Sequence, residues 1–147
     1  MGVYVVKNGP GTSTVTADNT YVGNTQINAG TLQVTRDTNL GDATVDREVR
    51  LQGGNLQISK GGSDFQSQRA VQVFNSGSVI VDADVAATLG SVATYTKDAN
   101  GVLTPDGNAV FTKDGAGALS VGLVGLTGGL VVVGGGLSAG RLYLQCK

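Results

Sequence analysis

The sequence predicts an all-β fold in which short strands stack as successive coils of a parallel β-helix. Three observations predict it: glycine is abundant, at 24 of 147 residues, aromatic residues make up only 5%, and one short strand pattern recurs along the chain. Hydrophobic residues at 40% and charged residues at 14% are typical of a folded chain, because disordered chains are rich in charge and poor in aliphatic residues. The length favours a single domain.

The recurring pattern is a glycine, any residue, and then two apolar positions separated by one residue. It reads GTLQV at Gly30, GNLQI at Gly54, GSVIV at Gly77, GALSV at Gly117 and GRLYL at Gly140, with weaker copies at Gly11 and Gly101. Most neighbouring copies lie about 23 residues apart, which is a spacing typical of repeat architectures.

A second short strand precedes several copies of the pattern. It reads TQIN before Gly30, REVRLQ before Gly54 and AVQVFN before Gly77, and each alternates apolar with polar residues as a strand with one buried face does. Each repeat is therefore predicted as strand, tight turn, strand and longer loop. Because glycine adopts positive φ without a Cβ clash, we expect it to mark the turns, at Gly9, Gly11, Gly23, Gly30, Gly54, Gly77, Gly117 and Gly140.

In a stack of such coils, equivalent residues lie above one another at the spacing of paired strands, about 4.8 Å. The period places Leu32 under Leu56 and then Val79, and it places Val34 under Ile58 and then Val81, while Gln33, Gln57 and Ile80 face outward. A flat antiparallel sandwich is the alternative, although its strands would not be expected to keep one motif at one period.

Three segments near the amino terminus carry a family resemblance: KNGPG at residues 7–11, NTYVG at 19–23 and INAGTL at 27–32. Together with NLGD at 39–42 and LQGGNLQI at 51–58, they resemble the passenger-associated transport repeat, also called the autotransporter-associated β-strand repeat. KDGAG at 113–117 opens a second, partial unit. The chain is thus expected to be one β-helix segment over 1–147, with a first unit over about 3–112 and a partial second unit over 113–147.

The resemblance implies a right-handed parallel β-helix of about six turns. It implies a segment of a Gram-negative autotransporter passenger, exported by type V secretion and then secreted or displayed outside the outer membrane. The expected partners are the remainder of its own passenger and the C-terminal outer-membrane barrel. A stalk segment that assists passenger folding and secretion is the leading hypothesis, and the whole protein is then an adhesin or another virulence factor.

Composition argues against most chemistry. The chain has no histidine, one cysteine at Cys146 and a net charge of −1, which disfavours a nucleic-acid binder. We expect no catalytic residues and no cofactor. The best carboxylate pair is Asp82 and Asp84, which would share one face of a strand. Such a pair could bind Ca²⁺ or supply an acid and a base, although two solvated acids at a strand end is the simpler interpretation.

Two other functions remain open. The loop at 89–109 breaks the period, and loops often carry binding residues, so an adhesive module contacting a host surface ligand is one alternative. A glycan-active β-helix enzyme using Asp82 and Asp84 is the other. Both ends of such a coil also expose unpaired strand edges, so an isolated segment is expected to self-associate end to end.

Overall fold

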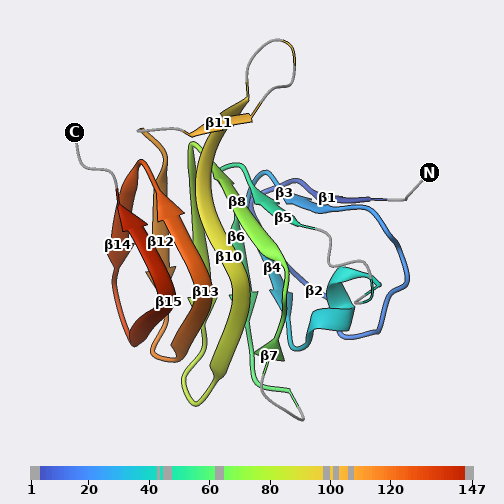
Figure 1. The fold of residues 1–147 in the computed structure, drawn as a ribbon. Helices are drawn as coiled ribbons and strands as arrows, with labels where there is room; N and C mark the ends of the chain where they lie inside the picture. Colours follow the sequence, from blue (N-terminus) through green and yellow to red (C-terminus); the bar gives the residue numbers. More distant parts are fainter. Residues whose placement is uncertain are drawn as a thin grey trace.

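The chain folds as an all-β right-handed parallel solenoid of about five turns, as a computed structural model shows (Figure 1). The structure describes residues 4–42, 44, 48–61, 65–97, 100, 103–105 and 108–144. The predicted fold class is confirmed, and the number of turns is close to the six expected. The elements, in chain order, are β1 (Val5–Lys7), β2 (Thr12–Thr14), β3 (Thr25–Ile27), β4 (Thr31–Val34), the 3₁₀ helix η1 (Asp37–Leu40), β5 (Val49–Leu51), β6 (Asn55–Ile58), β7 (Phe65–Gln66), β8 (Ala70–Phe74), β9 (Ser76–Val81), β10 (Ala86–Lys97), β11 (Leu103–Pro105), β12 (Val110–Asp114), β13 (Ala118–Leu126), β14 (Gly129–Val132) and β15 (Gly136–Leu144).

The strands form two parallel sheets that run the length of the stack. One sheet has the order β1-β3-β5-β8-β10-β13-β15, and the other has the order β14-β12-β9-β6-β4-β2. Each strand pairs with its counterparts in the coils directly before and after it. The alternative of a flat antiparallel sandwich is therefore wrong, and among the described strands only β10 and β11 pair antiparallel.

The predicted side-chain columns are present. Leu32 pairs with Leu56, which pairs with Val79, and Val34 pairs with Ile58, which pairs with Val81. All six side chains are buried in one aliphatic core, whereas Gln33, Gln57 and Ile80 lie between them on the half-buried outer side. The alternation of apolar and polar residues therefore fixed which side of each strand faces inward.

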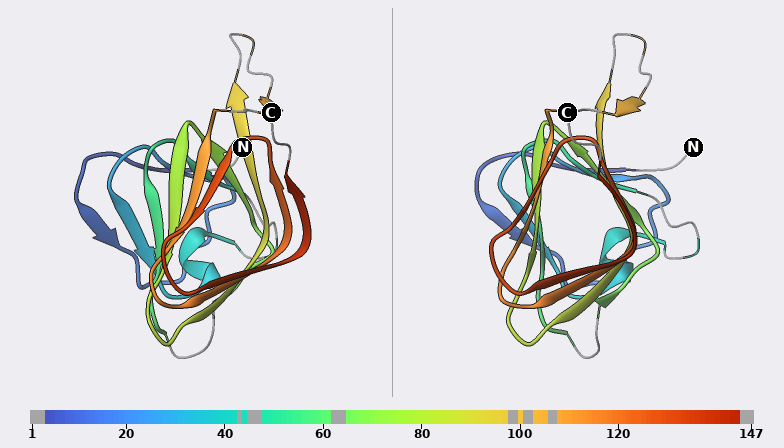
Figure 2. Two further views of the ribbon diagram at one scale, coloured as in Figure 1. Left: turned by 90° about the vertical axis from the view of Figure 1, so that its left-hand side faces the viewer. Right: turned by 60° about the vertical axis from the view of Figure 1, so that its left-hand side comes forward.

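The long strands bend at stacked glycines, so the coil has three faces. The pairing of β10 with β13 is interrupted at Gly90 and Gly122, and the pairing of β13 with β15 is interrupted at Gly122 and Gly140. A Cβ on Gly122 would lie 2.7 Å from the Gly90 carbonyl oxygen, and one on Gly140 would lie 2.8 Å from that of Gly122. Glycine allows this close approach, and the carboxyl-terminal coils trace a triangle in Figure 2.

The two halves of the solenoid close their coils differently. In the amino-terminal half, long connections over residues 15–24 and 35–48 replace the third side, and the second of them contains η1. Leu40 at the end of η1 and Phe65 in β7 are both 1% exposed and belong to the core. In the carboxyl-terminal half, short corners at 82–85, 115–117 and 133–135 lead directly into β10, β13 and β15, whose first residues pair with one another and form the third side. The η1 segment therefore contributes a core residue, Leu40, where the third side has no strand.

The expected loop over 89–109 contains a hairpin. Strand β10 extends through Lys97 and pairs antiparallel with β11, from Tyr95 opposite Pro105 to Lys97 opposite Leu103. The hairpin projects beyond the stacked coils (Figure 1). Gly101, which opens the weak repeat copy, lies outside the described residues, whereas Leu103 and Thr104 of that copy lie in β11.

The two Lys-x-Gly-x-Gly motifs lie at different corners of the coil. Lys7 ends β1, and the KNGPG corner leads from the first sheet to β2 in the second sheet. Lys113 lies in β12 of the second sheet, and KDGAG leads to β13 of the first. The pattern copies at Gly117 and Gly140 therefore occupy different faces from those at Gly30, Gly54 and Gly77. The hairpin inserted between β10 and β12 lengthens that coil. The spacing of the pattern copies along the sequence therefore no longer predicts the face of the coil on which each copy lies.

Both ends of the stack expose apolar side chains. The first coil exposes Tyr4 by 63% and Val6 by 39%, beside the exposed polar strand Thr12–Thr14. The last coil exposes Val131, Val132 and Val133 by 45–64%. Among the described residues, no helix has the length and apolar character needed to cross a bilayer.

Candidate functional site

The motif residues of the amino-terminal half lie where one coil contacts the next. Asn19 donates its side-chain amide to the Asn39 carbonyl oxygen at 2.9 Å, and Asn39 donates in return to the Ala17 carbonyl oxygen at 2.9 Å. Asn39 is 1% exposed, and its side-chain oxygen accepts from the backbone N–H groups of Thr35 and Arg36. The two asparagines therefore join the long connections of two coils and hold the turn of η1 closed.

Tyr21 and Gly41 form the next contact of this kind. The Tyr21 hydroxyl bonds the Thr25 hydroxyl at 2.8 Å, and the Tyr21 carbonyl oxygen accepts from the backbone N–H of Asp42. A Cβ on Gly41 would lie 2.5 Å from that oxygen and 3.0 Å from the tyrosine ring, so glycine is required there. Burial raises the pKa of Tyr21, and the Thr25 hydrogen bond offsets part of this rise.

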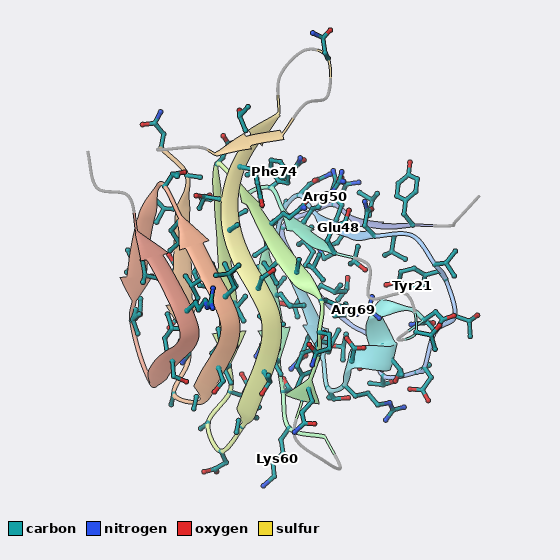
Figure 3. The ribbon with its side chains drawn as sticks, in the orientation of Figure 1. Tyr21, Glu48, Arg50, Lys60, Arg69 and Phe74 are labelled. Carbon is teal, nitrogen blue, oxygen red and sulfur yellow. The ribbon has the colours of Figure 1, made fainter. Side chains whose placement is uncertain are left out.

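A buried ion pair joins the following coil to η1. The Arg69 guanidinium lies 2.6 Å from the Asp37 carboxylate, and the two side chains are 1% and 12% exposed. Arg69 also donates to the Gly41 carbonyl oxygen, and the Ser67 hydroxyl donates to Asp37. Figure 3 shows Arg69 and Tyr21 near η1. This cluster joins the segment before β8 to the connection over 35–48, which takes the place of the third side of the coil.

Both Lys-x-Gly-x-Gly motifs surround a buried ammonium with backbone carbonyl groups. Lys7 is 8% exposed, and its Nζ donates to the carbonyl oxygens of Asn8 at 3.1 Å, Gly9 at 2.7 Å and Ala29 at 3.4 Å. Lys113 is fully buried, and its Nζ donates to those of Gly115 at 2.7 Å, Gly117 at 2.5 Å and Gly134 at 2.8 Å. Burial lowers the pKa of Lys113, and the Asp114 carboxylate offsets part of this shift.

The expected turn glycines fall into two groups. Gly9 and Gly30 have φ of 89° and 67° at the corners that follow β1 and β3. Gly11 lies in the same corner as Gly9, and Gly23 lies in the connection over 15–24. At the later corners, positive φ belongs instead to Gly53, Asn75 and Gly115. A Cβ on Gly54, Gly77 or Gly117 would meet Ile27, Leu51 or Asp82 of the preceding coil within 2.5 Å. Gly77 and Gly140 lie within strands, so close approach is the reason for glycine at these positions.

Asp82 and Asp84 lie beyond the end of β9, in a turn rather than on one strand face. The Asp82 carboxylate accepts from the Gln57 amide at 2.8 Å and from the Ser59 hydroxyl at 2.7 Å, so it caps polar residues of the coil below. Asp84 is exposed and has a φ of 65°. Within the part of the chain that the structure describes, no three acidic or thiol side chains gather as a metal site.

Residues 5–34 match the model of the passenger-associated transport repeat family. The chain is also similar to the adhesin BmaC autotransporter of Brucella suis biovar 1 (strain 1330), with 32% identity over 140 residues. The chain is an autotransporter passenger segment. The alignment includes 92% of this passenger segment but 4% of the length of that relative. No solved structure matches the passenger segment. It is secreted or surface-exposed on a Gram-negative bacterium.

Sequence reasoning missed several of the contacts that join the coils. The Lys7 and Lys113 motifs signalled turns, but their spacing gave no sign that the lysines are buried. Asp37 and Arg69 are 32 residues apart and belong to no short motif. Only the coil geometry brings them together. Cys146 lies outside the described residues.

Replacing Asp37 with asparagine should destabilise the passenger segment by on the order of 3 kcal/mol, because the substitution removes a carboxylate that lies 2.6 Å from the buried Arg69 guanidinium. The matched control is Asp18→Asn, which removes the partner of Arg36 in a pair whose side chains are 63% and 51% exposed. Such exposed pairs contribute little to stability. Urea unfolding of both variants measures the difference, and equal losses would refute the role assigned to the buried pair.

Proposed function

We propose that this segment is a structural part of the passenger, and that its coils form a stiff stalk and assist folding during export. The observation that supports the proposal most strongly is the pairing of each coil with its immediate neighbours alone. Asn19 with Asn39, Arg69 with Asp37 and both buried lysines add side-chain contacts between adjacent coils. Contacts between coils stabilise the stacked structure, so they account for these motif residues without a ligand.

Such a stack can fold one coil at a time, because each coil requires only its neighbour as a template. Outside the cell, coils that fold as they emerge would prevent the chain from sliding back. The free energy of stacking could then bias export outward without a nucleotide. The remainder of the passenger and its own C-terminal barrel are the partners in this process.

A non-catalytic role agrees with the description of the relative as an adhesin. It also agrees with the place of Asp82, whose carboxylate is bonded to Gln57 and Ser59. An acid–base pair would need two carboxylates turned toward one substrate. The exposed valines of the last coil support the expectation that an isolated segment self-associates at its ends.

Secretion of the full-length passenger tests the proposal. The triple variant Gly30→Val, Gly54→Val, Gly77→Val should secrete far less passenger, since a Cβ at each position would lie within 2.5 Å of the preceding coil. A matched triple, Gly11→Val, Gly125→Val, Gly136→Val, places each Cβ where no atom lies within 4 Å. Passenger in the medium and on the cell surface is quantified for both. Equal secretion by the two triples would contradict a folding role.

The projecting hairpin supports a second candidate function, an adhesive module. It extends beyond the stacked coils between β10 and β12 (Figure 1), where it is accessible to a host surface, and the relative is an adhesin. Exposed hairpins on a rigid scaffold are common sites of recognition.

Deletion of residues 97–106 from the full-length passenger separates this candidate from the stalk. If the hairpin binds a host surface, the deletion should abolish attachment to host cells while secretion stays normal, because none of the other strands pairs with β11. Cell attachment and secretion are measured together. Normal attachment would rule out the adhesive role of the hairpin and leave the stalk role intact.

A further inference from the structure

Lys113 occupies a position that every other described coil above the first fills with an aliphatic residue. It pairs with Val79 on one side and Val132 on the other, in the column that runs from Ser13 of the first coil through Leu32 and Leu56. Its side chain is fully buried. An ammonium in such a column is costly unless its hydrogen bonds are satisfied. The corner therefore has to supply those bonds.

The acceptors come from two coils. Gly115 and Gly117 belong to the corner that follows Lys113 itself, while Gly134 belongs to the corner of the next coil. Gly134 directly precedes Gly135, whose φ is 64°. A Cβ on Gly135 would lie 2.5 Å from the Lys113 Nζ, so this corner is shaped around the ammonium.

Lys7 repeats the arrangement on another face. Its own corner supplies the carbonyl oxygens of Asn8 and Gly9, and the next coil supplies that of Ala29. Ala29 directly precedes Gly30, whose φ is 67°. In both cases the third acceptor lies in the coil that follows in sequence, before a glycine of positive φ. The column position of that following coil holds Ile27 or Val132.

The aliphatic columns alone discriminate poorly between coils. Leucine, isoleucine and valine recur at equivalent positions of successive coils, so a coil shifted by two residues, or stacked on a different neighbour, would still bury apolar side chains. A shifted coil would not bring its carbonyl group to the ammonium. The shifted coil would therefore leave one donor of the buried ammonium without its acceptor, and this unsatisfied donor penalises the alternatives.

We propose that Lys7 and Lys113 are positioning residues that select which coil stacks on which, and in which register. The third hydrogen bond of each ammonium forms only when the following coil places a corner carbonyl oxygen within hydrogen-bond distance of Nζ. The inference concerns the order of the coils within the fold and does not depend on how the segment is exported.

The variant Lys113→Met tests the proposal, because methionine keeps the unbranched apolar stem and removes the ammonium. The matched control is Lys60→Met, since Lys60 is exposed and projects away from the coils (Figure 3). We expect two or more sets of backbone amide signals for β12, β14 and their neighbours in the Lys113→Met spectrum. The native protein and Lys60→Met should give one set. Registers that differ by many backbone hydrogen bonds exchange slowly, so their signals remain separate.

A single set of signals from folded Lys113→Met, whatever its stability, would overturn the proposal. If that variant does not fold, Lys7→Met decides, because β1 pairs with β3 alone and the remaining coils can stay native. We then expect a second set of amide signals that is confined to β1, β2 and their partner strands β3 and β4. An unchanged spectrum, or loss of hydrogen-exchange protection without a second set, would overturn the proposal.

Discussion

Parallel pairing between successive coils is the constraint on which the rest of this structure depends. It places each residue directly above its counterpart in the neighbouring coil. A residue type that suits one position must therefore also pack against the same kind of residue in the coils above and below. Aliphatic side chains meet this condition, as in the column from Leu32 through Leu56 to Val79. Where backbones approach closely, as at Gly90 and Gly122, a Cβ has no room. Polar groups remain inside only where a corner supplies their partners.

This constraint explains what could be read from the sequence. Strand alternation and the repeat period together predicted the columns from Leu32 through Leu56 to Val79 and from Val34 through Ile58 to Val81, because both are local patterns. The hairpin of β10 and β11 could not be predicted, since it interrupts the period. Its insertion places the second Lys-x-Gly-x-Gly motif on another face, which no linear spacing reveals. Burial of Lys113 depends on carbonyl groups of two coils, and burial of Arg69 depends on Asp37, 32 residues away.

The family motifs take on a physical meaning in this setting. Asn19, Tyr21 and Asn39 contact adjacent coils through their side chains or backbone. The amino-terminal coils use such side chains because their long connections lack strand pairing. The carboxyl-terminal coils close with short glycine corners and need fewer of them. One polypeptide thus joins its coils in two ways, by side-chain bridges and by close backbone contact.

Cysteine cross-linking across the stack tests the order of the coils most directly. Gln57 and Ile80 are direct partners in adjacent coils and face outward, at the Cα separation that a disulfide requires. Gln33 and Ile80 lie two coils apart, roughly 10 Å, which is too far. In a Cys146→Ser background, Gln57→Cys with Ile80→Cys should form an intramolecular disulfide on mild oxidation, while Gln33→Cys with Ile80→Cys should remain reduced. Cross-linking of the second pair in preference to the first would contradict the stacked solenoid.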